Sequence, residues 1–597
     1  MLFSRFRQFF RQLPAGRRAL ALVWSAAGGW TLAWGILLVG QGLIPAGLAL
    51  LLRSLVNRLV ASHGGGAIAA PALGIAGLWI AGHVMSSALS WVRAVQAERV
   101  QDEIHRLIHE QALRMDLAFY DHAESYDQLH RARVDAITQP LALLENLGTM
   151  VQGGLGFLVL AGILWTYARW LPVLLVLTAV PGLLLVARHI LQEHIWNLEH
   201  TKQERRARYL DWLITDRSAA AELRLFGLGE HHRAAFEAIQ GELREGRLRL
   251  ERKGAITELG AGFLAWGGSL VGLGWMLQRT LAGKTGLGDL LLCFQAFQQS
   301  QMLLRSLLGG AGKVYRSLLF IDNLEEFLKL EPVILPGAKG GAGLPVQNSI
   351  RFEDVVFSYP GGAHHALNGF NMEIPKGKVV ALVGHNGAGK STLIKLLCRF
   401  YDPDGGRILI DGVNLRSLDP AALRRQIAVL FQEPVRYHTT VQKNIAFGDL
   451  EGLSDEGRAR QAALDAGAME PIERLPRGFE ELLGKWFGGA ELSGGEWQRI
   501  ALARAFFRQA SLVILDEPTS AMDSWAEQDW LGRFRTLTEG RTGLMITHRF
   551  TTAMYADMIH VLDKGRIVES GTHAGLVALG GVYATSWTAQ MQEFSHA

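Results

Sequence analysis

Residues 384–392 read Gly-His-Asn-Gly-Ala-Gly-Lys-Ser-Thr. The pattern G-x-x-x-x-G-K-[ST] runs from Gly384 to Ser391, after the apolar run 379–383 and before the helix-forming run 392–397. Glycines let successive backbone N–H groups close around phosphate oxygens, and the following helix adds the positive end of its dipole. We therefore predict a phosphate-binding loop rather than a plain glycine-rich turn, with Lys390 on the phosphates and the Ser391 hydroxyl on Mg²⁺.

A second glycine-containing motif lies at residues 492–496, Leu-Ser-Gly-Gly-Glu, followed by Gln498 and Arg499. The pattern S-x-x-E predicts a capping box at the start of a helix over 497–508. Two glycines in a first turn weaken a helix, but they leave amides open for an anion. The motif resembles the signature of ATP-binding cassette (ABC) proteins. This resemblance implies that the signature of one cassette closes on ATP held by another, so that turnover requires a dimer.

Adjacent carboxylates follow the apolar run 511–515, which predicts a strand buried in a parallel sheet. Asp516 and Glu517 are costly at a strand end unless a cation or a reaction uses them. They resemble the Walker B motif, which implies that Asp516 supports Mg²⁺ and that Glu517 orients and deprotonates the attacking water. Residues 520–523, Ser-Ala-Met-Asp, resemble the D-loop that links the two sites of a dimer.

The family resemblance also assigns three further residues. His548 follows the short apolar run 544–547 and matches the switch histidine, Gln432 follows the run 427–431 and matches the glutamine that senses metal and water, and Tyr359 matches the aromatic platform for adenine. The implied catalytic residues are Glu517, His548, Gln432 and Lys390, and the implied Mg²⁺ ligands are Ser391, Gln432 and Asp516. The implied nucleotide contacts are Tyr359, Gly384, His385, Asn386, Gly387, Ala388, Gly389, Lys390, Ser391, Thr392, Gln432, Ser493, Gly494, Gly495, Glu496 and Asp516.

The composition of the chain agrees with that of a membrane protein. The whole sequence is 49% hydrophobic and 19% charged. Six apolar runs, each long enough to cross about 30 Å of hydrocarbon, lie near 20–52, 67–92, 141–167, 170–191, 255–281 and 286–310. Six crossings place the N-terminus and the ATPase on the same, cytoplasmic side of the inner (plasma) membrane. Twelve Lys and Arg residues within 192–254 agree with the positive-inside pattern.

The connections between the apolar runs indicate the type of membrane domain. Short loops follow runs one, three and five, whereas connections of about 48 and 63 residues follow runs two and four. This arrangement resembles the exporter-type ABC membrane domain, in which a transverse helix in each long connection docks on an ATPase; residues 119–127 and 215–226 match these elements. The basic, aromatic first 18 residues predict an interfacial helix.

The predicted fold is multidomain: an all-α transmembrane domain of six helices (1–330), a Pro- and Gly-rich linker (331–348) and an α/β P-loop NTPase domain with a helical signature subdomain (349–597). The expected function is ATP-driven export, with ATP and Mg²⁺ as cofactors. The expected partners are the lipid bilayer and a second copy of the chain. A heterodimer subunit, an exporter-folded importer and an ATP-gated channel or regulator stay open as alternatives. A net charge of +4 gives little support to nucleic-acid binding.

Two features bear on the cargo. Polar residues inside a bilayer usually face a cavity or a partner, and Gln295, Gln298 and Gln299 share a helical face in the sixth run. They line a translocation route or form helix–helix hydrogen bonds; Arg305, Glu145, Glu258 and His83 are further candidates. Residues 484–491, together with 431–437, are similar to exporters of modified peptides, such as lantibiotic exporters.

Overall fold

The computed structural model describes residues 13–596 except 62–64, 123–124, 126–127, 130–131, 134–138, 336, 338–345, 363, 519–529, 531 and 535–537. The chain forms two compact units, one of residues 1–113 and 127–330 and the other of residues 114–126 and 331–597. Most of the predicted interfacial helix (residues 1–12) and all of the predicted D-loop (520–523) lie outside the described residues.

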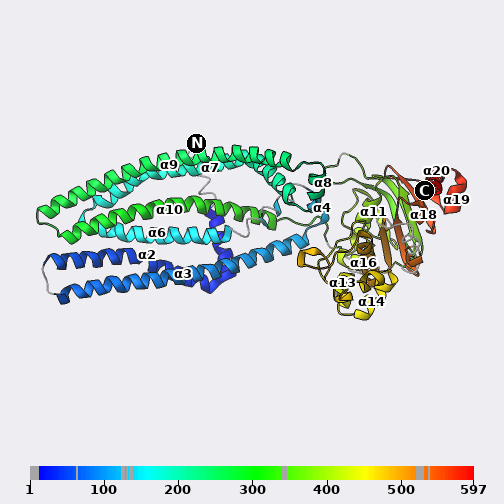
Figure 1. Ribbon diagram of the computed structural model, residues 1–597, viewed down its shortest axis with the longest axis horizontal. Helices are drawn as coiled ribbons and strands as arrows, with labels where there is room; N and C mark the ends of the chain where they lie inside the picture. Colours follow the sequence, from blue (N-terminus) through cyan, green and yellow to red (C-terminus); the bar gives the residue numbers. More distant parts are fainter. Residues whose placement is uncertain are drawn as a thin grey trace. The chain divides into compact units, whose positions relative to one another are not determined.

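The first unit is built from long helices. Its described helices are α2 (Leu13–Val60), α3 (Gly65–Arg114), α6 (Gln139–Tyr167), α7 (Trp170–Thr215), the short α8 (Ala220–Leu225), α9 (Gly229–Leu281) and α10 (Leu287–Leu328). Figure 1 shows α2 beside α3, α6 beside α10, and α7 beside α9. Each apolar run predicted from the sequence lies within one of the six long helices, apart from Gly286, which caps α10.

Length and apolar composition support membrane crossing for part of this set. Among the described residues, four stretches meet both requirements: Arg17–Val60, Ile68–Arg114, Ala142–Tyr167 and Gly229–Leu281. Residues Trp170–Gly182 form a shorter apolar stretch. The glutamines of α10 lower its hydropathy. Six crossings therefore stay a prediction, although the helical character of the described part of this region is confirmed.

Polar contacts join α2 to α10 near both ends of these helices. Near the end of α2, the Arg53 Nε atom lies 2.6 Å from Asp289 Oδ1, and the Tyr167 hydroxyl of α6 donates to the same oxygen at 2.7 Å. Near the start of α2, Arg18 pairs with Asp322 at 3.2 Å and also with Glu325. Between them, Ala46 of α2 and Phe297 of α10 lie in one apolar cluster with Leu160 and Leu164 of α6.

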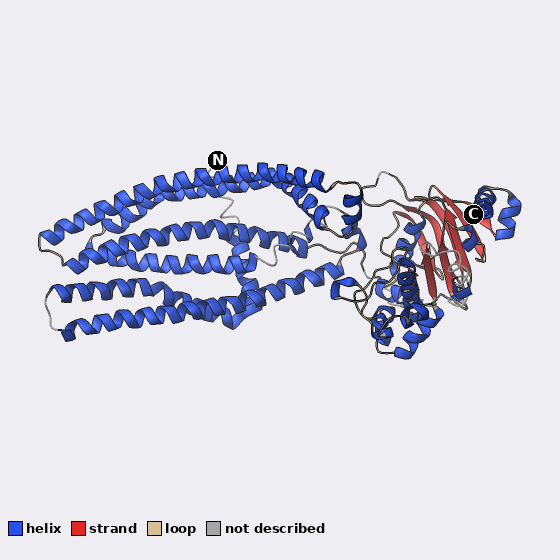
Figure 2. Ribbon diagram, viewed as in Figure 1, coloured by secondary structure: helices blue, strands red, loops and turns tan. Residues whose placement is uncertain are grey.

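The second unit contains two sheets (Figure 2). The larger has the order β10-β9-β3-β8-β7-β6, and all neighbours in it are parallel except β10 and β9. Its strands are β3 (Val379–Gly384), β6 (Ile427–Leu430), β7 (Leu512–Asp516), β8 (Thr542–Ile546), β9 (Met558–Asp563) and β10 (Arg566–Gly571). The smaller, antiparallel sheet has the order β2-β1-β4-β5, with β1 (Ser349–Phe357), β2 (Leu367–Pro375), β4 (Gly405–Ile410) and β5 (Val413–Asn414).

Strand β3 shows why the unit has two cores. Side chains alternate across a strand, so Val380 and Leu382 enter the core shared with the smaller sheet, whereas Ala381 and Val383 enter the core on the opposite face. A strand buried on both faces has to be apolar throughout, as 379–383 is.

Helices cover both faces of the larger sheet. They are α11 (Lys390–Leu397), α12 (Pro420–Arg425), α13 (Val441–Ala446), α14 (Glu456–Asp465), α15 (Met469–Glu473), α16 (Gly494–Phe507), α18 (Phe550–Ala553), α19 (His573–Leu579) and α20 (Val582–His596). Helices α13, α14 and α15 pack with α16 around Trp497 and Ile500. A helical N-terminal region followed by an α/β domain is thus confirmed.

A segment from the connection between α3 and α6 belongs to this second unit. Helix α4 (Leu117–Asp121) packs Leu117 and Ala118 against the core of the smaller sheet. Asp116 accepts hydrogen bonds from the backbone N–H groups of Val333 (2.6 Å) and Ile334 (3.0 Å). Within the predicted element at 119–127, Asp121 accepts a hydrogen bond from the Tyr401 hydroxyl of the α/β core.

Candidate nucleotide site

The site begins at the loop between β3 and α11. Gly387 and Gly389 have φ angles of 82° and 104°, which side chains rarely allow. A Cβ atom on Gly389 would lie 2.4 Å from the Ala366 carbonyl oxygen. Glycine is therefore required at position 389 by backbone conformation and by space. The loop leads into the N-terminus of α11, where backbone N–H groups have no partner within the helix.

Lys390 is buried in this loop. Its Nζ atom donates to the carbonyl oxygens of Gly384 (2.6 Å) and His385 (3.0 Å). Burial lowers the pKa of the ammonium group, and the negative charges of Glu517 and Asp516 oppose that shift. The loop thus holds a cation that is poorly hydrated, which favours binding of a phosphate.

A cavity of about 1040 Å³ opens over the loop. Most of the predicted site residues line it: Tyr359, Gly384, His385, Asn386, Gly387, Gly389, Lys390, Ser391, Thr392, Gln432, Glu517 and His548. Ala388 and Asp516 are buried beneath this lining. Residues 493–496 are not among the described residues that line it.

Strand order explains how distant residues reach the cavity. Gln432, Glu517 and His548 follow β6, β7 and β8, and the carboxyl ends of parallel strands meet at one edge of the sheet. The Gln432 Nε2 atom donates to Glu517 Oε2 at 2.9 Å, and His548 Nδ1 lies 3.3 Å from Glu517 Oε1. Glu517 has a φ of 48°, a strained conformation for this residue type, and its N–H donates to the Ile546 carbonyl at 2.9 Å. The carboxylate is thereby held between an amide and an imidazole.

Asp516 is a candidate support for a cation. Burial, together with the charge of Glu517, raises its pKa to about 6, while Lys390 and a hydrogen bond from Ser391 act in the opposite direction. Its Oδ1 atom is buried without a hydrogen-bond partner among the described residues. A carboxylate and a hydroxyl in contact fit Mg²⁺, which binds through few protein oxygens and completes its shell with phosphates and water. Within the described chain, no cluster of three or more His, Cys, Asp or Glu side chains forms a metal site by itself.

Tyr359 is fixed from several sides. Its hydroxyl lies 3.1 Å from the Thr392 hydroxyl, and its ring makes edge contacts with Phe357 and Tyr401 at centroid distances of 5.1 and 5.6 Å. A rigid aromatic ring at a cavity wall suits stacking of a base.

The predicted signature begins α16. Ser493 and Glu496 form the expected capping box: the Ser493 N–H donates to Glu496 Oε2 at 2.8 Å, and the Glu496 N–H donates to the Ser493 hydroxyl at 3.3 Å. Arg474 donates to the other Glu496 oxygen at 2.6 Å, so this carboxylate is already engaged. A Cβ atom on Gly494 would meet nothing within 4 Å, which leaves the helix terminus open to a ligand. Gln498 donates to the Pro518 carbonyl at 2.6 Å and so ties α16 to the end of β7.

Sequence patterns missed part of the lining. The additional residues are Ala366, Phe550, Val561, Leu562, Asp563, Val568, Val582 and Ser586. Most come from β9, β10, α18 and α20, which carry no phosphate-binding motif. Leu562 is placed by pairing, since β9 lies beside β3 in register with Gly384. Only the strand order could have identified it.

The sequence of this chain is similar to the sequences of several known proteins. The sequence profile of the ABC transporter family matches residues 367–520. The chain is 31% identical to the subtilin transport ATP-binding protein SpaT of Bacillus subtilis, over 78% of this chain and 76% of that protein. It is also 31% identical to the ATP-dependent lipid A-core flippase of Paraburkholderia xenovorans, over 87% of this chain and 86% of that one. A mitochondrial potassium channel ATP-binding subunit from Pongo abelii is 34% identical, with 82% and 67% covered.

A solved structure shares the fold of most of the chain. The structure of a bacterial Atm1-family ABC exporter with ATP bound superposes with a TM-score of 0.79, at 23% sequence identity, and covers 95% of this chain and 99% of that chain. The likeness includes the helical region as well as the α/β unit. The chain therefore belongs to the ABC transporter family, as an exporter-type half-transporter whose ATPase is coupled to transport across a membrane.

Proposed function

We propose that the chain exports a substrate across the cytoplasmic membrane as one subunit of a dimer, by alternating access driven by ATP. In this proposal residues 1–330 form a transmembrane domain that crosses six times, 331–348 a linker and 349–597 the nucleotide-binding domain with its helical signature subdomain. The N-terminus and the ATPase face the cytoplasm. The observation that carries the proposal is Glu517, held between Gln432 and His548 at the edge of the cavity above the phosphate-binding loop.

ATP binding would replace the two contacts that the Lys390 ammonium makes in this structure. Its ammonium donates to two loop carbonyls, and phosphate oxygens can replace them as stronger, charged acceptors. The purine would stack on Tyr359. Segment 492–496 of the second copy would then close on the phosphates, because the Gly494 end of α16 is open. This closure would turn the transport route outward.

Hydrolysis would depend on Glu517. Its carboxylate would accept the proton of the attacking water, while Gln432 and His548 hold its two oxygens in place. Ser391, Gln432 and Asp516 would hold Mg²⁺, which supplies charge stabilisation at the phosphates when bound. Release of phosphate would separate the cassettes and return the route to the cytoplasm.

The cargo class follows from the relatives and from polar groups of α10. The printed names of two relatives concern subtilin transport and a lipid A-core flippase; we propose a peptide, a lipid or an amphipathic small molecule. Gln298 lines a small cavity with Trp266 and Phe294, and Gln295 buries an oxygen that has no partner among the described residues. Gln301 instead donates to the Ala265 carbonyl at 2.7 Å, which is a helix–helix contact.

ATP hydrolysis by the chain purified alone into lipid nanodiscs tests the proposal, with Glu517→Gln as the variant. We expect turnover that depends on Mg²⁺ and falls by about 10²–10⁴-fold in the variant, while ATP still binds. Crosslinking between copies during ATP binding reports the dimer. If neither protein hydrolyses ATP although both bind it, the homodimer is wrong and the chain requires a different partner subunit.

A second candidate function has a specific observation in its favour, because one relative is named as a potassium channel ATP-binding subunit. In that case ATP would gate a channel and nothing would move against a gradient. Gating needs binding more than hydrolysis, so the Glu517 contacts favour the exporter. Ionic current across a bilayer after ATP addition, with Glu517→Gln retaining that current, would support the channel and contradict export. The remaining alternative, an exporter-folded importer, predicts ATP-dependent accumulation on the cytoplasmic side.

A further inference from the structure

An ion pair joins α4 to α11, beside Tyr359, the residue predicted to stack on the nucleotide base. Lys395 of α11 places its Nζ atom 3.6 Å from Asp121 Oδ2, at the end of α4. The same carboxylate oxygen accepts a hydrogen bond from the Tyr401 hydroxyl. All these residues belong to the α/β unit. One carboxylate of α4 is thus shared by a cation and a phenol.

The Lys395 ammonium also lies over two aromatic rings. Its Nζ atom is 4.8 Å from the centroid of Tyr359 and 5.7 Å from that of Tyr401. Both distances lie within the range of cation–π attraction. Tyr359 lines the nucleotide cavity, whereas Lys395 is not among the described residues that do so. The ammonium therefore acts on the ring, with no need to touch a nucleotide.

The position of this charge matters more than the strength of its ion pair. The side chains of Lys395 and Asp121 are 32% and 43% exposed, and such a pair contributes little stability by itself. The pair does fix where the ammonium lies. Since Tyr359 lines the cavity and Lys395 is not among the described residues that do so, the cation can hold the ring without contacting the base.

We propose that Lys395 is a positioning residue for the nucleotide base, held by Asp121, and that it links the seating of α4 to base stacking on Tyr359. This inference rests on the proposed nucleotide site and extends it to regulation by the connection between α3 and α6. Linkage is reciprocal: if α4 in place favours base binding, bound nucleotide favours α4 in place by the same factor.

Comparing the binding of ATP with that of inorganic tripolyphosphate, which lacks the base, separates an effect of Lys395 on base stacking from a general effect on binding at the site. We expect Lys395→Met to weaken ATP binding about two- to fivefold and to leave tripolyphosphate binding unchanged, because only the base uses Tyr359. Lys395→Arg restores a cation over the rings and should restore most of the ATP affinity. Equal losses for the two ligands, or no loss for ATP, would contradict the proposal.

The role of α4 requires a second pair of variants. Asp121→Asn should give the same ATP-selective loss, and the double variant Asp121→Asn, Lys395→Met should bind ATP no more weakly than Lys395→Met alone. Independent, multiplying losses would show that α4 is not connected to the base through Lys395. These measurements use the full chain in nanodiscs.

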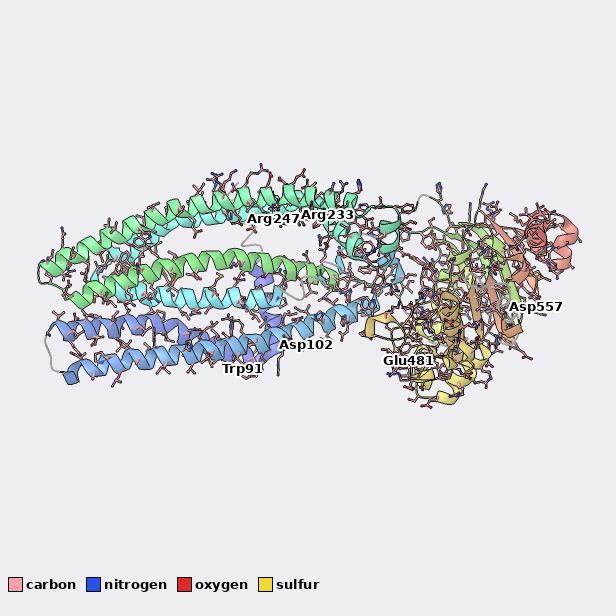
Figure 3. The ribbon with its side chains drawn as sticks, viewed as in Figure 1. Trp91, Asp102, Arg233, Arg247, Glu481 and Asp557 are labelled. Carbon is pink, nitrogen blue, oxygen red and sulfur yellow. The ribbon has the colours of Figure 1, made fainter. Side chains whose placement is uncertain are left out.

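A matched control uses another lysine pair of the same unit. Lys378 lies 3.0 Å from Asp557, which is labelled in Figure 3, and neither residue is among the described residues that line the cavity. Lys378→Met removes a comparable exposed ion pair and should leave both affinities unchanged. If wild-type protein bound neither ligand, the proposed nucleotide site itself would be wrong; normal ATP binding with no effect of Lys395→Met would overturn this inference alone.

Discussion

The α/β unit and the helical unit use polar residues in different ways. In the α/β unit, the side chains that follow the parallel strands β6, β7 and β8 meet the phosphate-binding loop after β3 at one sheet edge, and they line a single cavity. In the helical unit, polar contacts are spread along the helices, as at Asp289 near one end of α10 and Asp322 near the other. The first arrangement permits few substitutions because backbone conformation and chemistry constrain the same residues. The second leaves residue identity much freer.

If the two units differ in this way, the same change from Gly to Ala should have opposite outcomes in them. Gly389→Ala should abolish ATP binding, because Ala at a φ of 104° is strained by about 1–2 kcal/mol and its Cβ atom would clash with the Ala366 carbonyl. Gly274→Ala in α9 should be neutral or stabilising by up to about 1 kcal/mol, since a Cβ atom there meets nothing within 4 Å. Nucleotide binding and thermal unfolding of both variants check this.

The result would contradict the comparison if Gly389→Ala bound ATP within about tenfold of wild type, a difference of 1.4 kcal/mol. A folded but inactive Gly389→Ala protein, with an unchanged melting temperature for the helical unit, would support the comparison, because the damage would be confined to the loop.

Within the helical unit, we expect the two ends of α10 to differ. Asp289 is 8% exposed and accepts from Tyr167 and from the Gly286 N–H, so Asp289→Ala should destabilise the protein by about 2–3 kcal/mol. Asp322 is 39% exposed in its side chain, and Asp322→Ala should cost less than about 1 kcal/mol. Thermal unfolding in nanodiscs measures both effects. Equal losses of stability in Asp289→Ala and Asp322→Ala would show that burial does not distinguish these contacts.

Asp516 should make the α/β unit sensitive to pH in the absence of nucleotide. Burial raises its folded-state pKa to about 6, above the unfolded value near 4, so the stability that protonation provides is present below about pH 4 and is lost as pH rises towards 6. Asp516→Asn mimics the protonated form. The variant should therefore be more stable than wild type by on the order of 2 kcal/mol at pH 7, with the advantage shrinking on acidification.

The matched control for this prediction is Asp102→Asn, since Asp102 is exposed on α3 (Figure 3). Melting temperatures are measured between pH 5 and 8, with EDTA and without ATP. The difference between wild type and Asp516→Asn should change with pH, whereas the difference between wild type and Asp102→Asn should stay constant. An advantage of Asp516→Asn that persists unchanged at pH 5 would contradict the shifted pKa.

Sequence reasoning worked best where conformation and chemistry coincide. The loop at 384–392 needs glycine for its backbone and a cation for phosphate, so its residues can be predicted from the sequence alone. The capping box of Ser493 and Glu496 was likewise predictable from local spacing and is confirmed. Helix existence in the first half followed from long apolar runs, and the structure places the runs in long helices.

Two kinds of feature could not be predicted. Residues such as Val568 and Ser586 reach the cavity through strand pairing and helix packing, which leave no local pattern. For α4, the family resemblance predicts that residues 119–127 dock on an ATPase, but it does not predict which side chains make the contact. One such pair is Asp121 and Tyr401, which lie more than 200 residues apart. Distant pairs of this kind become visible only in three dimensions.

The smallest expected effect concerns the cargo route. Gln298 is exposed beside a small cavity of α9 and α10, so Gln298→Leu should change ATP-dependent movement of cargo about two- to tenfold, the worth of one hydrogen bond, and leave basal ATP hydrolysis within about twofold. Gln301→Leu is the comparison variant: Gln301 lines the same cavity, but its amide bonds α10 to α9, so its loss should lower stability as well. Movement of a labelled amphipathic peptide and of a fluorescent phospholipid in vesicles provides the readout. Equal losses of movement and of basal hydrolysis in Gln298→Leu would mean that this residue, like Gln301, holds helices together.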